Sequence, residues 1–532
     1  MRRQGMKRGL AAILAAAMVL GGCGGGQSAG GSGGGQQAAG GGSQTEAGGT
    51  AGTVADSVIT LGDGVDIKHM DPQETDDIYS MFLLKHLYNK LFKLGENNEI
   101  LCDLAESYDV EDELTYHIVL RQGVKFHDGS EMKASDVKFT LERAKEKAGT
   151  KVNAKYIDSV TINGDYDLTI KTTDPYPSLL YFLSGESMSI VSEAVVTAAE
   201  ANGGIYEEQP VGTGPFKFVE WMPNDHWTIE RFDDYFGDTP MASSITCRVI
   251  PEASARVIAL ETGEIDAALN VGAVEAANVE ANSDLVLETG ISPAVSYLGL
   301  NTQKGALADQ RVRQAVAYGV NKQEIVDTIL EGRGEVANSF MGKTIPGWNE
   351  SLEAYPRDVE KAKALLAEAG YGDGLKLELF INGDQNNRSA QLIQAQLSEV
   401  GIDVEISMYE WGALTEAVKA GKHDMFIMGW ANRSGDPDYS MSPLFHSSSI
   451  GSNNSSFIAD DKLDEMIITA KTDMDNERRM QEYKDIQTYL KELSPWVPLY
   501  YSMSTAGRRA DLEGFEFSAA TGNYAGNCHY NK

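Results

Sequence analysis

Cysteine is scarce in this chain of 532 residues, which contains only four. After Cys23 the remaining three, Cys102, Cys247 and Cys528, lie far apart. Zinc knuckles and redox motifs need closely spaced cysteines, so the sequence indicates neither. Two interpretations of these three thiols stay open: an exported protein can pair two of them in a disulfide, or keep all three as buried free thiols.

Basic residues are also in short supply. Lys and Arg number 45 against 78 Asp and Glu, which gives a formal net charge of −33. Such a chain has no basic face to neutralise phosphates, so we expect no nucleic-acid partner. Hydrophobic residues make up 42% of the chain, enough for real cores. At ~150 residues per domain, the length fits roughly three to four domains or one large multi-part fold.

Sequence motifs of enzyme chemistry are missing from the body of the chain. From Ser57 onward there is no G-x-S-x-G, H-E-x-x-H or G-x-x-x-x-G-K-[ST] pattern. The eight histidines include no pair at i and i+2 or i+4 that could hold a metal ion from one element. We therefore expect no catalytic residues, no metal site and no cofactor, and we predict that the protein is not an enzyme.

Long apolar runs are confined to the N-terminus. Gly9 to Leu20 follows four basic residues, and at about 12 residues it is shorter than the roughly 20 of a membrane-spanning helix. This is typical of a secretory signal, and the following Leu20-Gly21-Gly22-Cys23 resembles a bacterial lipoprotein box. We expect 1–22 to be a signal peptide, with a plain signal and an incidental cysteine as the alternative.

The residues after this signal predict a membrane-tethered protein. If Cys23 is lipidated, the Gly/Ser-rich stretch 23–53 forms a flexible tether, because it cannot bury a core. The protein would then lie at the extracytoplasmic face of the cell membrane, attached through the lipid anchor alone.

From about Ser57 the chain has the pattern of a mixed α and β protein. The clearest stretch predicts strands and helices in the order β-α-β-α-β, at 375–381, 388–400, 404–409, 411–420 and 424–430. This order predicts parallel strands flanked by helices, with ligands beyond the carboxyl ends of the strands. Antiparallel strands are expected elsewhere, which makes the fold class α/β.

Helix boundaries are also readable from the sequence. Asn321 with Glu324 resembles a capping box, and Asp358 is expected to begin a helix that Gly370 ends. Ser135 is expected to cap a helix that runs to 147.

Seven segments of the body carry a recognisable family pattern. They are Met70-Asp71-Pro72 with Leu87-Tyr88-Asn89, Lys125 to Ser130 with Ala134 to Val137, Pro210 to Phe216, Leu300-Asn301, Arg311 to Ala315 with Tyr318 and Asn321-Lys322, Ala362 to Tyr371, and Pro495 to Tyr501. In this order they resemble family 5 of the extracellular solute-binding proteins of ABC importers, the dipeptide-, oligopeptide- and nickel-binding group. The resemblance spans nearly all of 57–503.

The resemblance implies a two-lobed periplasmic-binding-protein-like clamshell of class II type, with an extra subdomain inserted in the first lobe. We place the main part of lobe I at 54–88, 207–292 and 502–532. Its insertion is expected at 89–206 and lobe II at 293–501.

The strand predicted at 424–430 then ends at the cleft between the lobes. Trp430, with Asn432 and Arg433 in the following loop, is a ligand-site candidate from both the strand pattern and the resemblance. Trp411 lies 19 residues before Trp430, the spacing at which similar peptide binders place two cleft tryptophans. Ordinary core packing is the alternative for either tryptophan. Candidates from the first lobe are Asp76, Tyr79 and His69.

Arg433 departs from the family pattern. Well-known dipeptide and oligopeptide binders have an aspartate here that pairs with the α-ammonium group of the ligand. A guanidinium repels an ammonium and prefers a carboxylate or phosphate. Either the amino-group anchor has moved to Asp436 or Asp438, or the ligand presents an anion at this position. A surface pair of Arg433 with Asp436 is the alternative.

The resemblance further implies a monomeric binding protein that captures peptides and delivers them to the permease and ATPase subunits of an ABC importer. Three alternatives stay open. The first is a receptor for another solute, such as glutathione, an opine, a metal chelate or an oligosaccharide. The second is a surface signalling receptor, and the third is a secreted hydrolase on the same fold.

Overall fold

The computed structural model describes residues 57–531 except 76, 96–97, 148 and 204–205. The predicted signal peptide, Cys23, the tether and Asp76 therefore lie outside the described residues. Within the described part, no helix combines the length and the apolar character that crossing a membrane requires.

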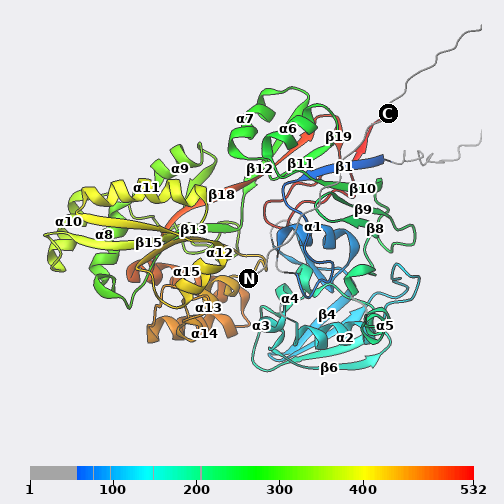
Figure 1. Cartoon of the computed structure of the whole chain (residues 1–532). Helices are drawn as coiled ribbons and strands as arrows, with labels where there is room; N and C mark the ends of the chain where they lie inside the picture. Colours follow the sequence, from blue (N-terminus) through cyan, green and yellow to red (C-terminus); the bar gives the residue numbers. More distant parts are fainter. Residues whose placement is uncertain (1–56, 76, 96–97, 148, 204–205, 532) are drawn as a thin grey trace, which may run out of the picture. The chain divides into compact units, whose positions relative to one another are not determined.

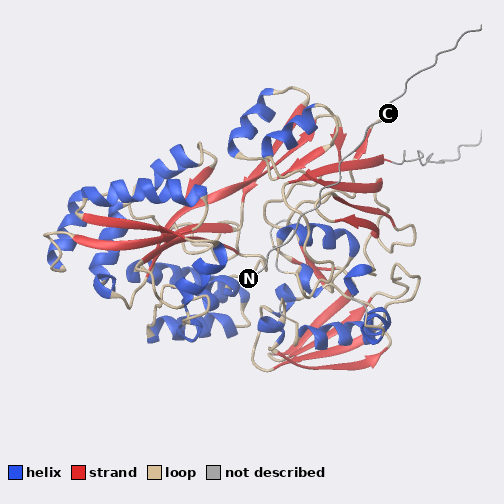
Figure 2. Cartoon of the chain, viewed as in Figure 1, coloured by secondary structure: helices blue, strands red, loops and turns tan. Residues whose placement is uncertain are grey.

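One twelve-stranded mixed sheet organises most of the described chain (Figures 1 and 2). Its strands are β1 (Ser57–Asp63), β8 (Phe216–Met222), β9 (His226–Arg231), β10 (Ala242–Val249), β11 (Ala267–Leu269), β12 (Leu285–Ile291), β13 (Ala294–Leu300), β14 (Gly334–Val336), β15 (Leu375–Ile381), β16 (Ile402–Met408), β17 (Met425–Ala431) and β18 (Trp496–Arg509). Their order is β16-β15-β17-β13-β18-β11-β1-β10-β9-β8, and β12 and β14 also pair with β18. Two sets of strands are parallel: β15 with β16 and β17, and β1 with β10 and β11.

The predicted β-α-β-α-β unit is present as β15, α11 (Asp384–Glu399), β16, α12 (Trp411–Lys419) and β17. The strand bounds agree with prediction to within two residues. Helix α11 begins four residues before the predicted start at 388, directly after the turn at Gly383, whose φ is +75°. The sequence pattern missed this first turn because Asp384 to Asn387 carries no apolar residue.

Helix capping follows the sequence in two of three places. In α9 (Lys322–Ile329) the Asn321 side chain accepts from the Glu324 N–H at 3.3 Å, and in α10 (Val359–Glu368) Asp358 accepts from the Lys361 N–H at 2.9 Å. The prediction for Ser135 is wrong, because α2 (Ala134–Ala144) already begins at Ala134. There the Asp136 carboxylate, a stronger acceptor than a hydroxyl, accepts from the Lys133 N–H at 2.9 Å.

Two hydrophobic clusters built from residues Val295 to Tyr501, here called core B, lie on the two faces of one part of the sheet. Along β15, Leu379 and Ile381 belong to one cluster and Phe380 to the other, as the alternation of a strand requires. One face is covered by α8 (Gln310–Gly319), α9, α10 and α11, and the other by α12, α13 (Asp438–Phe445), α14 (Asp461–Thr472) and α15 (Asn476–Leu493) (Figure 1).

A separate cluster, here called core A, packs around β1, β9 and β10. It buries one face of α1 (Ile78–Leu87) and takes in α5 (Glu193–Ala201), β19 (Leu512–Glu513) and β20 (His529–Tyr530). A smaller adjoining cluster joins α6 (Ala253–Glu261), α7 (Ala273–Ala281), β11 and β12.

Residues 91 to 190 form their own core, here called the small module. Its four-stranded antiparallel sheet has the order β4-β5-β7-β6. The elements are β2 (Phe92–Leu94), β3 (Ile100–Cys102), β4 (Ala105–Asp112), β5 (Thr115–Leu120), α2, α3 (Lys151–Ala154), β6 (Ile157–Gly164), β7 (Asp167–Thr172) and α4 (Leu179–Phe182).

Cys102, Cys247 and Cys528 are all free thiols, and the last two are buried. Of the two interpretations of these cysteines, the structure fits the one without a disulfide.

His86 joins α1 to the C-terminal segment of the chain. Its ring is fully buried, stacks on Tyr524 with centroids 4.8 Å apart, and places Nδ1 2.8 Å from the Phe82 carbonyl. The Ala525 N–H donates to Nε2 at 3.2 Å, so the ring is held as the neutral tautomer with its proton on Nδ1. Burial lowers the pKa of His86 from 6.5 to about 3, against the opposing effect of the Phe82 hydrogen bond.

We predict that acid weakens the docking of the C-terminal segment through His86. A lowered pKa means that the stability contributed by the neutral ring is present above pH 6.5 and is lost as pH falls towards about 3. His86→Gln keeps an acceptor for Ala525 but cannot titrate. It should lower stability at pH 7 and flatten the decline between pH 6.5 and 3 in urea unfolding.

The matched control is His226→Gln. His226 pairs with Glu220 and Asp225, and these hydrogen bonds raise its pKa in spite of the opposing effect of burial. This control should leave the acid limb as steep as in the wild type. Equal slopes for wild type and His86→Gln would contradict the assignment.

Candidate functional site

The carboxyl ends of the parallel strands in core B gather the residues that the sequence singled out. Ile381, at the end of β15, pairs with Met408, at the end of β16. Phe380 pairs with Phe426, so Ile381 is level with Ile427 and β17 continues for four more residues, to Ala431. The loop after β16, which leads into α12 at Trp411, and the loop after β17, which carries Arg433, therefore leave the same edge of the sheet.

The two candidate tryptophans have different surroundings. Trp411 is the first residue of α12 and is 58% exposed, which excludes core packing. Trp430 is half-buried in β17, and its ring lies 5.5 Å from that of Tyr439. Its Nε1 is buried without an acceptor among the described residues, so this indole retains an unused hydrogen-bond donor.

Asn432 organises the loop after β17. It is 2% exposed; its Oδ1 accepts from the N–H groups of Ser434 and Gly435 at 3.2 and 3.1 Å. Its Nδ2 donates to the Asp436 carbonyl at 2.7 Å. The Asn432 side chain thus holds the loop, while the neighbouring Arg433 is exposed.

Asp436 does not fit the expectation that it receives a ligand ammonium group. Its Oδ1 accepts from Arg479 Nη2 at 2.7 Å, from Ser178 Oγ at 2.9 Å and from the Asp438 N–H at 2.9 Å. The residue is 1% exposed. The cation paired with Asp436 is therefore the buried Arg479, which the sequence reasoning did not single out, rather than a ligand or Arg433.

Asp438 is also engaged inside the protein. Its carboxylate accepts from Ser442 Oγ and from Tyr483 OH, and lies 3.9 Å from Lys471 Nζ. Burial raises the pKa of Asp438, with Asp436 acting in the same direction and Lys471 against it. Asp436 and Asp438, the two carboxylates suggested as a relocated ammonium anchor, are thus both engaged by groups of the protein itself.

The first-lobe candidates lie at the start of α1. Asp77 caps this helix by accepting from the Tyr79 N–H at 3.1 Å, and the His69 N–H donates to Ser80 Oγ at 3.2 Å. Tyr79 and His69 are both half-buried. Burial raises the pKa of Tyr79, and the nearby Asp63 carboxylate raises it further. Asp76 is outside the described residues.

Asp63 is a candidate that the sequence reasoning missed. It ends β1, and β1 is parallel to β10 and β11, so it lies at the carboxyl edge of the parallel strands in core A. The residue is 6% exposed, and its Oδ1 accepts from the Gly64 N–H at 2.6 Å and from Asn270 Nδ2 at 3.0 Å. Asn270, which follows β11, adopts a left-handed φ of +54°, a strained conformation that often marks functional positions.

The Asp63 carboxylate forms no ion pair with another described residue. The nearby Arg256 instead donates to the carbonyl groups of Ile250, Pro251 and Asn270. Burial accordingly raises the pKa of Asp63. Trp430 was selected because it lies near the carboxyl end of a predicted parallel strand. The same criterion would select Asp63, but the short sequence of β1 does not reveal that this strand is parallel to its neighbours.

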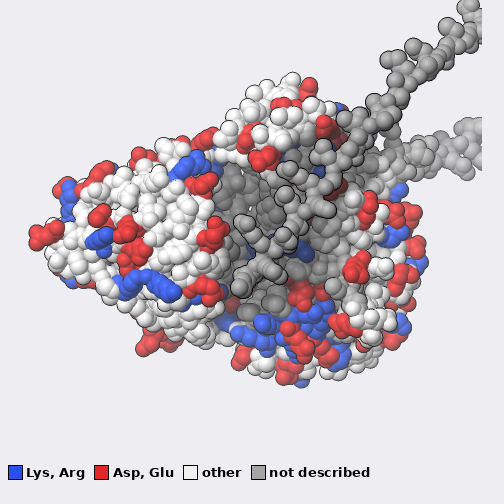
Figure 3. Space-filling model, viewed as in Figure 1, with Lys and Arg blue, Asp and Glu red and all other residues white. Residues whose placement is uncertain are grey.

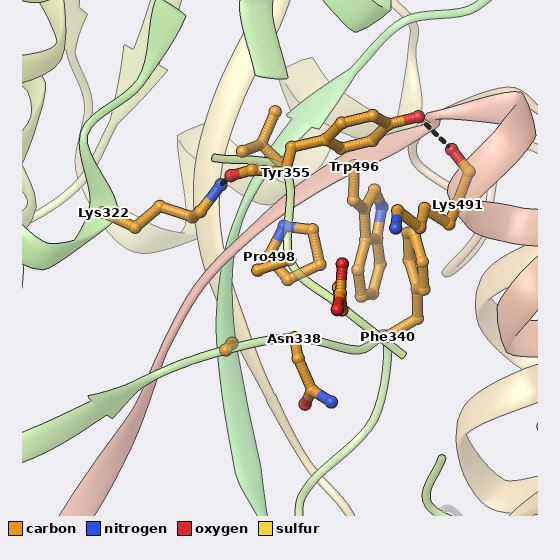
Figure 4. Close-up of a pocket in the computed structure, with 11 residues that line it drawn as sticks. Lys322, Asn338, Phe340, Tyr355, Lys491, Trp496 and Pro498 are labelled. Atoms are coloured by element: carbon orange, nitrogen blue, oxygen red, sulfur yellow. Dashed lines mark hydrogen bonds between the residues drawn. The ribbon is translucent and has the colours of Figure 1, made fainter. Parts of the chain in front are cut away.

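A small cavity among the described residues shows where a solute cannot be held. A cavity beside Lys322, Tyr355 and Trp496 has a volume of about 10 Å³, room for about one water molecule (Figure 4). There Lys322 Nζ donates to the Tyr355 carbonyl, and Tyr355 OH donates to the Lys491 carbonyl at 2.8 Å. This cavity is too small for a solute.

No group of three or more His, Cys, Asp or Glu side chains in the described part could hold a metal ion.

Charges of both signs are interspersed over the face drawn in Figure 3, where basic side chains over α3 lie beside acidic ones. The described residues that are visible on this face form no unbroken basic surface of the kind that binds nucleic acid.

Comparison with known proteins identifies the family. Residues 99–452 match the family model "Bacterial extracellular solute-binding proteins, family 5 Middle". The chain belongs to this family. It is 31% identical over 463 residues to the dipeptide-binding protein of Escherichia coli (strain K12), covering 81% of this chain and 86% of that protein. It is 29% identical over 480 residues to the glutathione-binding protein GsiB of Salmonella typhi, covering 87% and 93%.

A solved structure of a family 5 protein agrees with the fold. The periplasmic binding protein DppA of Helicobacter pylori, in complex with the peptide STSA, matches with a TM-score of 0.77 and 30% identity over 90% of this chain and 98% of that one. The family consists of two-lobed solute-binding proteins that serve ABC importers on the extracytoplasmic side of the membrane. The predicted family and fold class are confirmed.

We predict that Asp63→Asn raises the thermal midpoint at neutral pH. The amide keeps an acceptor for Gly64 and Asn270 and removes a buried charge. Because the pKa is raised, the stability due to the protonated carboxyl is present below its ordinary value of 3.8 and is lost as pH rises through the folded value. The gain from Asn should therefore shrink towards pH 3.

Thermal unfolding between pH 3 and 8 measures this gain, with the exposed Asp109→Asn as the control that should change nothing. A lower midpoint for Asp63→Asn at pH 7 would show that the charge stabilises the fold.

Proposed function

We propose that this chain is a lipid-anchored substrate-binding protein that captures peptides between its two lobes and delivers them to an ABC importer. The proposal rests mainly on the placement of two polar edges. Core A carries Asp63 at the end of β1, with Tyr79 of α1 nearby. Core B carries Trp430 in β17 and Arg433 in the loop that follows. The dipeptide-binding relative and the peptide-bound DppA support the peptide class.

We assign the lobes as the sequence suggested, with lobe I at 54–88, 207–292 and 502–532, and lobe II at 293–501. The separation of core A from core B supports this division. The lobes are then joined where β12 leads into β13 and in the middle of β18. The small module supports an insertion at 89–206, although Val191, Val196 and Tyr206 pack on core A.

In this mechanism the solute contacts both lobes only when they are closed, so binding shifts the equilibrium towards the closed state. Moving the ratio from 1:99 to 99:1 takes roughly 5.5 kcal/mol of preferential interaction with the closed form. Donors and acceptors on both edges suit a peptide, whose backbone groups and termini need partners of both kinds, while water can fill pockets around its side chains. The closed form is then recognised by the permease, and the solute leaves unaltered.

A second candidate is a solute that offers an anion to core B, such as glutathione. It is favoured by the donors at this edge, the exposed Arg433 guanidinium and the unused Nε1–H of Trp430. The carboxylates of Asp436 and Asp438 are engaged with other groups of the protein. The glutathione-binding relative supports this candidate.

The direct experiment is mass spectrometry of the solute that co-purifies with the protein, followed by calorimetric titration of that compound. A peptide or peptide-like compound that binds one to one and is recovered unchanged is the expected result. A chemically altered product, or saturable binding only of unrelated sugars, would contradict the proposal.

We predict that Arg433→Ala weakens binding of the co-purified solute by about tenfold or more, equivalent to ~1.4 kcal/mol, by removing a guanidinium that pairs with its anionic group. Calorimetry gives the dissociation constants. Arg478→Ala is the matched control, because Arg478 is exposed and pairs with Asp473 on the protein itself. Unchanged affinity for Arg433→Ala would remove Arg433 from the site.

We predict that Cys23→Ser releases the protein into the medium or leaves the precursor uncleaved. Serine has no thiol for the lipid, and the net charge does not favour anionic membranes. Membrane fractionation with immunoblotting measures the distribution. Membrane retention of a fully processed Cys23→Ser protein would contradict the lipid anchor.

A further inference from the structure

Among the described residues, side-chain hydrogen bonds link the small module to core B at three places. Ser178 Oγ donates to Asp436 Oδ1 at 2.9 Å, Asn98 Nδ2 donates to the Thr344 carbonyl at 2.8 Å, and Lys471 Nζ donates to Tyr156 OH at 2.6 Å. The Gly435 backbone of core B also lies close to side chains of the module. A Cβ added at Gly435 would lie 2.8 Å from the Leu94 side chain.

The Ser178 contact is centred on a buried ion pair. Arg479 in α15 and Asp436 after β17 both belong to core B, and each is 1% exposed. Ser178 comes from the module and bridges the two charges, because it accepts from Arg479 Nη2 at 2.9 Å while it donates to Asp436. One hydroxyl thus forms a hydrogen bond with each member of the pair.

Aromatic residues of the module complete the cover over this pair. Tyr176 is 3% exposed. Burial raises the pKa of its hydroxyl, and the nearby carboxylates of Asp438 and Asp436 raise it further. The Tyr176 carbonyl accepts from Tyr116 OH at 3.0 Å, and Lys471 lies 4.3 Å from the centre of the Tyr156 ring. These aromatic residues belong to the module, so they can cover the ion pair only where the module is docked on core B.

Docking of the small module on core B therefore makes one unfavourable and one favourable contribution to the free energy. Removing water from an ion pair is unfavourable unless other groups replace the lost hydrogen bonds. Ser178 replaces them on Arg479 Nη2 and Asp436 Oδ1, whereas Asp436 Oδ2 stays buried without a partner. The unpartnered oxygen leaves a residual cost of docking, so we expect loss of the Ser178 hydroxyl to shift the docking equilibrium towards the undocked state.

We propose that Ser178, acting through the Asp436–Arg479 pair, is an affinity-determining positioning residue that stabilises the closed receptor without contacting the solute. This inference rests on the proposed closing mechanism. It assigns the inserted module a role in binding: the module supplies a closure contact separate from the solute site. The same contact explains why Asp436 cannot act as a ligand anchor.

The test measures docking directly by pulsed electron paramagnetic resonance on the full chain. Spin labels are attached through Glu111→Cys in the module and Glu465→Cys in core B, both at exposed positions, in a background carrying Cys23→Ser and Cys102→Ser. Distances are recorded without additive and with a tryptic digest of casein as the peptide probe. Wild type should show a short-distance population, and Ser178→Ala should reduce its ratio to the long-distance population by about tenfold.

Matched variants separate docking from folding. Ser178 makes no capping hydrogen bond in α4, so Ser178→Ala should leave this helix folded. Ser184→Ala is the control, because Ser184 Oγ donates only to the Tyr181 carbonyl within the module, at 2.7 Å. Ser178→Thr keeps the hydroxyl and should restore docking. Asn98→Gly removes a second contact at a φ of +58° that glycine adopts freely, and it should act in the same direction as Ser178→Ala.

The outcomes are distinct. A short-distance population that Ser178→Ala leaves unchanged, or that is missing from wild type under both conditions, overturns the inference. A population that falls with Ser178→Ala but does not respond to the digest supports the closure contact and counts against peptide as the solute.

Discussion

One long strand, β18, connects the two halves of this protein, because its backbone N–H and C=O groups need hydrogen-bond partners along its whole length. The first part of β18 pairs with β13 and β14, and its last seven residues pair with β12 and, in part, β11. Unpaired buried backbone groups are costly, and a slip of one residue would turn every side chain of the strand to the opposite face. The pairing register of β18 therefore holds core A and core B in one sheet. Only a few strands connect the two cores.

This arrangement determines where binding chemistry is found. Each core has its own set of parallel strands, and the polar loops leave each set at its carboxyl edge. Asp63 lies at one edge and Arg433 at the other, with opposite charges and different neighbours. The ion pair between Asp436 and Arg479 lies beyond the second edge and meets the small module through Ser178. The proposed solute contact of Arg433 and the proposed docking contact of Asp436 thus come from neighbouring residues of one loop.

The sequence predicts the regular elements of core B well and the roles of individual polar residues poorly. Strand β15 was placed at its correct bounds, because alternation from Leu375 to Ile381 and the flanking glycines leave no competing interpretation. Asn432 and Asp436 are polar residues next to a candidate tryptophan, and nothing in their order reveals that one holds the loop and the other meets an arginine 43 residues later. Long-range pairing of this kind carries no local pattern. Asp63 was missed for a related reason, since the partners β10 and β11 that make β1 a parallel strand are nearly 200 residues away.

Small-angle X-ray scattering of the full chain, with and without the solute recovered from it, tests the central claim most directly. Capture between two lobes predicts a smaller radius of gyration when the solute is bound, reversal of the change on dialysis, and recovery of the solute with its mass unaltered. Identical scattering profiles at saturating solute, or a change of mass in the recovered compound, would contradict a receptor that closes on its solute and releases it intact.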